Sequence, residues 1–123
     1  MEGIINAIVE GNYEYFVELV SQSGPDVCDG NGFTPLMYCI QNDRPEMADF
    51  LLEKGADVDR ENALGNTALF YAVFHSRNRT DFIGKLLRAG ADMNHANKSG
   101  VTPLALANTM ANDRVRDFMN GWS

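Results

Sequence analysis

The sequence predicts an all-α solenoid, a single domain over residues 1–123 built from stacked pairs of short helices. Three observations favour this fold. A motif of the form Gly-x-Thr-Pro/Ala-Leu begins at Gly32, Gly65 and Gly100, with starts 33 and 35 residues apart. A second motif, Gly-Ala-Asp followed by an apolar residue and by Asp or Asn, begins at Gly55 and Gly90. A nearly fixed period of this size is typical of stacked structural repeats.

Each copy of the first motif has the residues that begin a helix. Its threonine can accept a hydrogen bond from a backbone N–H of the first turn; these threonines are Thr34, Thr67 and Thr102. Pro35 and Pro103 follow at the first helical position, where the missing N–H costs nothing. Ala68 replaces the proline in the middle copy, so we expect that helix to begin less firmly. The glycine of the second motif can close a helix in the left-handed conformation.

Apolar residues at helical spacing and the breaks between them predict the remaining elements in order. The first helix is expected from Ile4, Ile5, Ile8 and Val9, and the second from a face of Tyr15, Phe16, Leu19 and Val20. We expect Pro45 to interrupt the chain and Thr80 to cap the helix after it. Polar, β-hairpin-like finger loops join each pair to the next. The expected helices are residues 3–9, 13–22, 34–42, 46–54, 67–75, 81–89, 102–110 and 113–120.

These motifs together resemble the ankyrin repeat. The pattern Gly-x-Thr-Pro-Leu, a short helix, and a second helix ending in Leu-Leu-x-x-Gly-Ala-Asp-Val fits closely in residues 29–61 and loosely in residues 1–28. The resemblance implies an ankyrin-repeat solenoid of about four repeats, with the first and last acting as caps. The approximate repeat bounds are 1–28, 29–61, 62–96 and 97–123.

Composition limits the cellular setting. No run approaches the 18 apolar residues of a membrane span, and the N-terminus lacks the pattern of a secretory signal, so we expect no membrane association. Cys28 and Cys39 are expected to stay reduced, Cys39 on the buried face of a helix. These features predict a cytoplasmic protein.

The charge is strongly asymmetric along the chain. The net charge is −7, and residues 1–61 hold 13 of the 17 acidic side chains but only 3 of the 10 basic ones. An acidic half would repel phosphates, so we expect no nucleic-acid partner. A protein partner with a basic surface fits better. The alternative is that the charge only keeps a small stack in solution.

No group of residues predicts catalysis, a metal or a cofactor, so the chain is not expected to be an enzyme. His75 and His95 fall in different repeats without neighbouring ligand motifs. Asp57, Asp59 and Glu61 share one finger but lack the rest of a calcium loop. The expected apolar surroundings of Cys39 disfavour a reactive thiolate.

A binding surface is the remaining candidate. The resemblance implies that a protein partner binds the concave face made by the fingers and the first helix of each pair. Phe33, Leu64 and Phe74 are the expected apolar anchors, and Phe74 occupies a position that is usually polar in the family. The full set of expected partner-binding residues is Asn31, Phe33, Gln41, Asn42, Asp57, Asp59, Glu61, Leu64, Asn66, Phe74, His75, Val101 and Met110.

Three functional hypotheses follow. The leading one is a non-enzymatic protein–protein interaction module that uses its concave face and is monomeric rather than homo-oligomeric. The second is a small acidic immunity or inhibitor protein that neutralises a toxin or an enzyme. The third is a structural protein that self-associates through its C-terminal repeat, where Trp122 would leave apolar surface uncovered.

Overall fold

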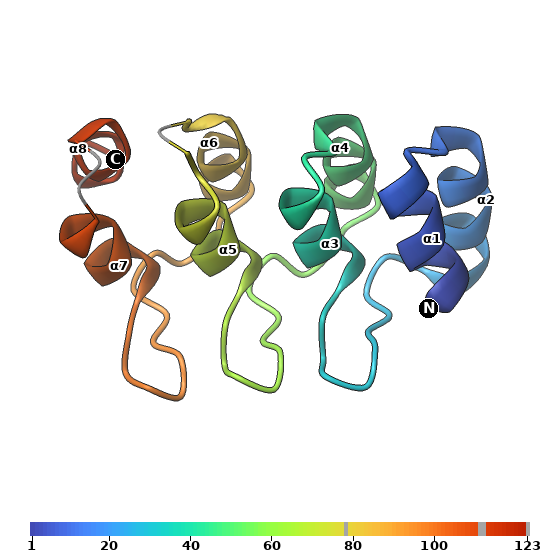
Figure 1. Cartoon of the computed structure of the whole chain (residues 1–123), viewed down its shortest axis with the longest axis horizontal. Helices are drawn as coiled ribbons and strands as arrows, with labels where there is room; N and C mark the ends of the chain where they lie inside the picture. Colours follow the sequence, from blue (N-terminus) through green and yellow to red (C-terminus); the bar gives the residue numbers. More distant parts are fainter. Residues whose placement is uncertain (78, 111–112, 123) are drawn as a thin grey trace.

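Eight helices, arranged as four antiparallel pairs, make up the regular structure of the residues that the computed structural model describes, which are 1–77, 79–110 and 113–122. Their order along the chain is α1 (Glu2–Glu10), α2 (Tyr13–Ser23), α3 (Pro35–Gln41), α4 (Pro45–Glu53), α5 (Ala68–Phe74), α6 (Asp81–Arg88), α7 (Pro103–Thr109) and α8 (Asp113–Asn120). The pairs lie side by side in chain order, and a long finger loop descends before α3, α5 and α7 (Figure 1). This is the all-α repeat solenoid that the sequence predicts.

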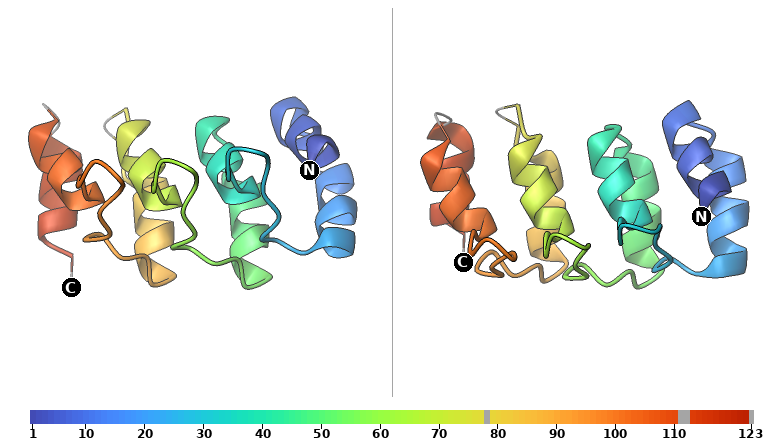
Figure 2. Two further views of the ribbon diagram at one scale, coloured as in Figure 1. Left: turned by 90° about the horizontal axis from the view of Figure 1, so that it is seen from below. Right: turned by 60° about the horizontal axis from the view of Figure 1, so that its bottom comes forward.

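The helix pairs form two rows. The odd-numbered helices lie on the side from which the fingers project, and the even-numbered helices form the row behind them (Figure 2). Neighbouring helices pack within each row, α1 on α3, α3 on α5 and α5 on α7. The fingers and the odd-numbered helices therefore share one continuous face of the solenoid.

The threonine caps form as the sequence predicts. Thr34, Thr67 and Thr102 each have extended backbone, and each hydroxyl accepts from the backbone N–H three residues later, at 3.3, 3.5 and 3.0 Å. The longest of these bonds belongs to Thr67, the one copy without a following proline. Gly55 and Gly90 take the expected left-handed conformation, with φ of 85° and 97°.

One apolar core runs through the stack from Ile4 to Met119. Each pair contributes a few fully buried side chains, such as Phe16, Leu51, Leu69 and Ile83. No pair could enclose these side chains alone, because the core lies between successive pairs. Stacking is therefore what removes the apolar surface from water.

Several local expectations are wrong. Pro45 does not precede α4 but is its first residue, where proline is well tolerated. Thr80 lies before α6 but makes no side-chain cap, because its ψ of 4° departs from the extended backbone of the three capping threonines. Tyr15 is exposed rather than part of the packed face of α2. Of the other helices, α1, α3, α5 and α7 differ from the expected bounds by one residue at both ends, α2 and α6 differ by one residue at the C-terminal end, and α8 matches them.

Candidate functional site

The three fingers are held against one another by backbone hydrogen bonds. The N–H of Ala63 donates to the carbonyl of Asn31 at 2.9 Å, and the N–H of Lys98 donates to the carbonyl of Leu64 at 3.1 Å. The two bonds occupy equivalent places, so each finger tip is set by the tip before it. Side chains that project from these tips are consequently displayed at a regular spacing on a rigid support.

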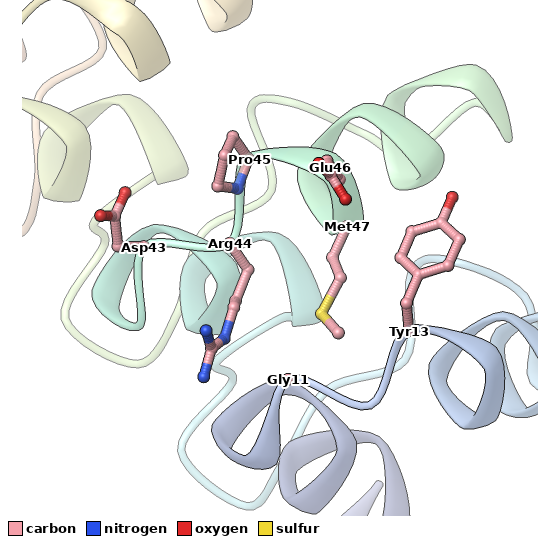
Figure 3. Close-up of a pocket in the computed structure, with 7 residues that line it drawn as sticks. All are labelled: Gly11, Tyr13, Asp43, Arg44, Pro45, Glu46 and Met47. Carbon is pink, nitrogen blue, oxygen red and sulfur yellow. The ribbon is translucent and has the colours of Figure 1, made fainter.

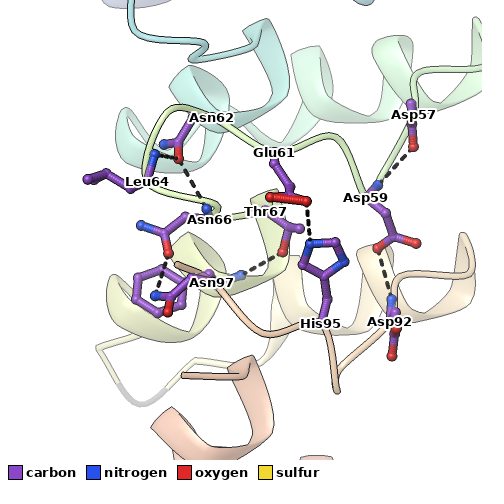
Figure 4. A network of polar contacts seen from close by, with 11 residues as sticks. Asp57, Asp59, Glu61, Asn62, Leu64, Asn66, Thr67, Asp92, His95 and Asn97 are labelled. Atoms are coloured by element: carbon purple, nitrogen blue, oxygen red, sulfur yellow. Dashed lines mark hydrogen bonds and ion pairs between the residues drawn. The ribbon is translucent and has the colours of Figure 1, made fainter. Parts of the chain in front are cut away.

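Aspartates form a second ladder at the base of the fingers. The Asp57 N–H donates to Asp26 Oδ1 at 2.9 Å, the Asp59 N–H to Asp57 Oδ1 at 3.0 Å, and the Asp92 N–H to Asp59 Oδ1 at 3.0 Å. Figure 4 shows the last two of these contacts beside the ion pair of Glu61 Oε2 with His95 Nε2, which are 3.1 Å apart. These acidic groups are therefore held in place by the fold while still facing solvent.

An aromatic row, made of Tyr38, Phe33, Tyr71, Phe70, His75 and Phe74, crosses the second and third helix pairs. The ring centre of Phe33 lies 5.9 Å from that of Tyr38 and 5.5 Å from that of Tyr71. Tyr71 and His75 stack at 6.2 Å, and Phe74 meets His75 edge-on at 5.0 Å. Phe70 and Phe74 also stack, at 6.3 Å. The row begins half-buried at Phe33 and ends at the solvent-exposed ring of Phe74.

Two large exposed apolar side chains lie on this finger and its helix. Phe74, on the last turn of α5, is 57% exposed, and Leu64, on the finger before α5, is 59% exposed. Leu64 lies at the tip of its finger, directed away from the asparagine network beside it (Figure 4). Large exposed apolar side chains on a rigid surface favour contact with another molecule.

The structure sorts the thirteen expected partner-binding residues by exposure. Phe33 contacts the core as well as the aromatic row, and Asn42 donates through Nδ2 to the carbonyl of Tyr38 at 2.9 Å. Both side chains therefore already have contacts within the protein and are less available to a partner than expected. The exposed members are Asn31, Gln41, Asp57, Glu61, Leu64, Phe74 and His75, and the half-buried ones are Phe33, Asn42, Asp59, Val101 and Met110.

Asn66 corrects the expectation of an exposed side chain. It is only 6% exposed, and its Nδ2 donates to the Tyr71 hydroxyl at 3.1 Å. The same hydroxyl accepts from Asn62 Nδ2 at 2.7 Å. Asn97 Nδ2 donates to Asn66 Oδ1 at 2.8 Å (Figure 4). Asn66 faces inward because these partners satisfy all the polar atoms of a side chain that would be costly to bury alone.

In the first finger a charged residue, Asp29, occupies the position that Asn62 has in the second. Asp29 accepts from the hydroxyl of Tyr38 and from the backbone N–H groups of Asn31 and Phe33. The hydrogen bond from Tyr38 lowers the pKa of Asp29. Desolvation, with the hydrogen bond to Asp29, raises the pKa of Tyr38 to about 12. Asp29 therefore supports the finger, in addition to carrying a negative charge.

Arg44 closes the first helix pair instead of offering a binding site. From the turn between α3 and α4 its Nε donates to the carbonyl of Ile8 at 2.8 Å, and its Nη2 donates to the carbonyl of Val9 at 2.9 Å. Figure 3 shows the side chain reaching down to the turn at Gly11, beside a cavity of about 230 Å³. The guanidinium thus satisfies the last carbonyls of α1, where positive charge also suits the helix dipole.

A repeated spacing in the sequence indicates the hydrogen bonds of the two tyrosines. Tyr38 follows Asp29 by nine residues, and Tyr71 follows Asn62 by nine residues. This repeated Asx-to-Tyr spacing marks a pair that bonds between the base of a finger and the following helix. The third copy has Leu106 nine residues after Asn97, and there the amide turns instead to the neighbouring Asn66.

Neither a metal-binding cluster nor a membrane-spanning helix is found within the described residues. No cluster of three or more His, Cys, Asp or Glu side chains there is arranged to hold a metal ion. In the same ranges, no helix has the length and hydrophobicity that crossing a bilayer requires. Burial raises the pKa of the Cys39 thiol, which opposes formation of the reactive thiolate.

Comparison with known proteins gives the same architecture. A family model for ankyrin repeats, in three copies, matches residues 4–97. Chicken (Gallus gallus) inversin is 35% identical over 102 residues, which are 81% of this chain and 9% of inversin. Rat (Rattus norvegicus) ankyrin repeat and SAM domain-containing protein 6 is 30% identical over 106 residues, 84% of this chain and 12% of that protein.

A shorter match joins the chain to an enzyme. The NAD-capped RNA hydrolase NUDT12 of Macaca fascicularis is 52% identical over 44 residues, which are 36% of this chain and 10% of that protein. In each of these relatives the chain spans only about a tenth of the length, so the similarity concerns their repeats. The match of the family model over most of the residues, together with the stacked helix pairs and fingers, shows that this chain belongs to the ankyrin-repeat family.

Proposed function

We propose that the chain is a non-catalytic module that binds a protein partner on the face formed by the fingers and the odd-numbered helices. Ankyrin repeats generally mediate protein–protein interaction, and the proposal assigns that role to a particular surface. The observation that carries it is that Leu64, on a finger, and Phe74, on the last turn of α5, are both large, apolar and exposed.

The apolar pair is the proposed anchor of the interface. Binding energy concentrates in a few large side chains that become fully desolvated. Phe74 is already supported from one side by Phe70 and His75. A supported ring loses little conformational freedom when a partner covers it, so more of its buried area contributes to affinity.

The acidic side chains are the proposed contacts for a basic partner. The ladder through Asp57 and Asp59 uses Oδ1 of each carboxylate to bind backbone N–H groups, which fixes their orientation. Charges that are fixed before binding need no reordering on association. They would accelerate encounter with a positively charged partner and favour one orientation of it.

The two cysteines bear on the cellular compartment. Cys28 is exposed and Cys39 is buried, and both are free thiols. Free thiols suit a reducing compartment, and we place the protein in the cytoplasm.

We propose a monomer, because Trp122 packs against Phe118 with ring centres 5.7 Å apart and so covers part of the apolar surface at the last pair. Light scattering at several concentrations tests this, and a mass that rises with concentration would argue for self-association.

The test of the binding face is the double change Leu64→Ala with Phe74→Ala. Phe33→Ala is avoided because Phe33 packs against Tyr38 and Tyr71, so its loss would disturb the fold. Affinity capture from extracts of the native host should recover the partner with the wild-type protein and fail to recover it with the double variant. Tyr15→Ala serves as the control, because Tyr15 is also large and exposed but lies on α2, in the row behind the proposed face.

The expected loss is at least about tenfold in affinity, since two anchors of about 1 kcal/mol or more are removed. Circular dichroism would verify that both variants keep their helices. Equal capture by wild type and the folded double variant would remove this face from consideration. Binding that survives in the double variant but is lost in Tyr15→Ala would move the interface to the row of even-numbered helices.

The charge of the partner is tested separately. Asp57→Asn with Glu61→Gln should slow association and reduce its dependence on salt, because acidic groups steer a basic partner at long range. Glu14→Gln with Glu18→Gln removes the same charge from α2 and should have a smaller effect. Equal effects of the two double variants would mean that only net charge matters, and that the finger acids make no specific contact.

A further inference from the structure

A two-part cavity lies between the turn that joins α3 to α4 and the turn that joins α5 to α6. The outer part has a volume of about 290 Å³. The inner part, about 20 Å³, shares Ile40, His75 and Arg79 with the outer part and is also lined by Ser76. The polar lining of the outer part comes from both turns, with Gln41, Asn42 and Asp43 on one side and His75, Arg77 and Arg79 on the other.

Ser76 places an unused hydrogen-bonding group at the end of this cavity. The residue is 5% exposed, and its Oγ has no hydrogen-bond partner among the described residues. A buried hydroxyl without a partner destabilises the folded state. The inner part is large enough for one atom of the size of a water oxygen. An oxygen atom bound there would satisfy the hydroxyl and remove that destabilisation.

Two guanidinium groups surround the same cavity. Arg79 Nη2 donates to Asp43 Oδ1 at 2.8 Å, which neutralises that carboxylate and leaves other N–H groups of Arg79 for a ligand. Arg77 makes no side-chain hydrogen bond or ion pair within the described part of the chain. Asp81 lines the inner part as well, so two carboxylates balance the two guanidinium charges, and what the cavity leaves unpaired is hydrogen-bond donors.

The backbone at Arg77 also has an unusual conformation. Arg77 has a φ of 49°, in the left-handed region that disfavours residues with a Cβ. The turns of the first two helix pairs also contain a left-handed residue, Gly11 with a φ of 74° and Asp43 with a φ of 56°. The conformation therefore belongs to this kind of turn. In the third pair it places a guanidinium at the mouth of the cavity.

We propose that this cavity is a binding site for an oxyanion, a carboxylate or a phosphate group. One oxygen of the ligand occupies the inner part and hydrogen-bonds Ser76 Oγ, while Arg77 and Arg79 donate to its other oxygens. Guanidinium groups suit both ligands because their planar forks donate two parallel hydrogen bonds. The site lies at the opposite end of α5 from the fingers and does not depend on the proposed function.

His75 supplies a reporter for this site. Burial, and then the nearby Arg77, lower the pKa of His75, so an added anion should raise it by stabilising the imidazolium. The other charged groups around the cavity are Asp43, Arg79 and Asp81. Because anion binding favours the protonated ring, affinity should increase as the pH falls through the pKa of His75.

The first experiment follows both histidines by NMR during pH titrations with sulfate or acetate, at constant ionic strength set with chloride. Sulfate keeps its charge over this range and stands for a phosphate group, while acetate stands for a carboxylate. We expect the pKa of His75 to rise by about one pH unit, while the signals of His95 should not respond to the added anion. A response to sulfate alone points to a phosphate source, and a response to acetate alone points to an acidic side chain. Identical results in chloride would overturn the proposal.

Variants separate a specific site from general charge attraction. Arg77→Gln and Ser76→Ala should each weaken sulfate or acetate binding about tenfold, as expected for loss of a charge-assisted hydrogen bond. Arg60→Gln, which removes the same charge from an exposed finger position, should leave binding unchanged. Ser76→Ala removes an unsatisfied group, so the variant should remain folded. Equal weakening by Arg60→Gln, or no weakening by Ser76→Ala, would contradict the assignment.

Discussion

Gly65 lies so close to the backbone of the next finger that a Cβ on it would be 2.7 Å from the nitrogen of Lys98. This is closer than any real Cβ contact, and the neighbour is backbone that cannot turn aside. Gly65 also has a φ of 77°, so it combines two requirements that only glycine meets. The approach allows the Lys98 N–H to reach the carbonyl of Leu64.

The first prediction is that Gly65→Ala destabilises the protein severely. The left-handed backbone costs about 1 kcal/mol for alanine, and moving the next finger away adds about 1–3 kcal/mol. Gly100 has nearly the same φ, 79°, but no atom near the place of its Cβ. Gly100→Ala should therefore cost only the first amount. Urea denaturation measures both, and equal losses would contradict the close approach.

The second prediction concerns the buried hydroxyl of Tyr71. Tyr71→Phe removes the acceptor of Asn62 Nδ2 and Asn66 Nδ2 and should lower the free energy of unfolding by about 1–3 kcal/mol. The loss arises because both amides stay buried without that partner. Thermal unfolding followed by circular dichroism provides the measurement.

A partner experiment distinguishes this role from binding. Asn66→Ala should destabilise the fold in the same way as Tyr71→Phe, because Asn66 belongs to the same network. Leu64→Ala, two residues earlier but exposed, should leave stability nearly unchanged. A stable Asn66→Ala variant that loses partner binding would restore Asn66 to the interface.

The burial of Asn66 illustrates what the sequence could and could not predict. Thr34, Thr67 and Thr102 cap their helices as predicted, because capping depends on residues only three positions apart. The solenoid followed from the repeated spacing of such signals. The exposure of Asn66 instead depends on Asn97, which lies 31 residues away in the next finger. Contacts between repeats differ from copy to copy, so the pattern of a single repeat does not contain them.

Phe33 and Phe74 differ for the same reason. Both were expected as apolar anchors, yet Phe33 is half-buried against Tyr71 of the following repeat while Phe74 stays exposed. The choice depends on which aromatic residue the neighbouring helix presents. The cavity beside Ser76 was likewise invisible in the sequence, since its walls come from two turns that only stacking brings together.

The third prediction follows from the hydrogen bond between Tyr38 and Asp29. Since the pKa of Asp29 is lowered in the folded protein, its ionised form contributes stability above the ordinary aspartate pKa of 3.8, and that contribution is lost as the pH falls through the lowered value. Asp29→Asn keeps an acceptor oxygen but has no proton to gain. The variant should therefore lose less stability than wild type as the pH falls below about 4.

Urea midpoints between about pH 2.5 and pH 6 test this linkage, because carboxylate titration dominates that range. Glu53→Gln removes a charge from an exposed position on α4 and should leave the pH dependence close to that of wild type. Parallel curves for Asp29→Asn and wild type would show that the interaction with Tyr38 does not depend on ionisation.

The last prediction is of stabilisation at Gly84, in the interior of α6. A Cβ there would be 3.5 Å from the ring of Phe118, an ordinary contact, and 3.1 Å from the guanidinium end of the exposed Arg88, which can move aside. Gly84→Ala should therefore raise the free energy of unfolding by about 0.5–1 kcal/mol, the usual gain in helix propensity. Denaturant unfolding measures the change. A destabilised variant would mean that α6 and α8 pack more tightly than these distances indicate, and that the glycine is required for their approach.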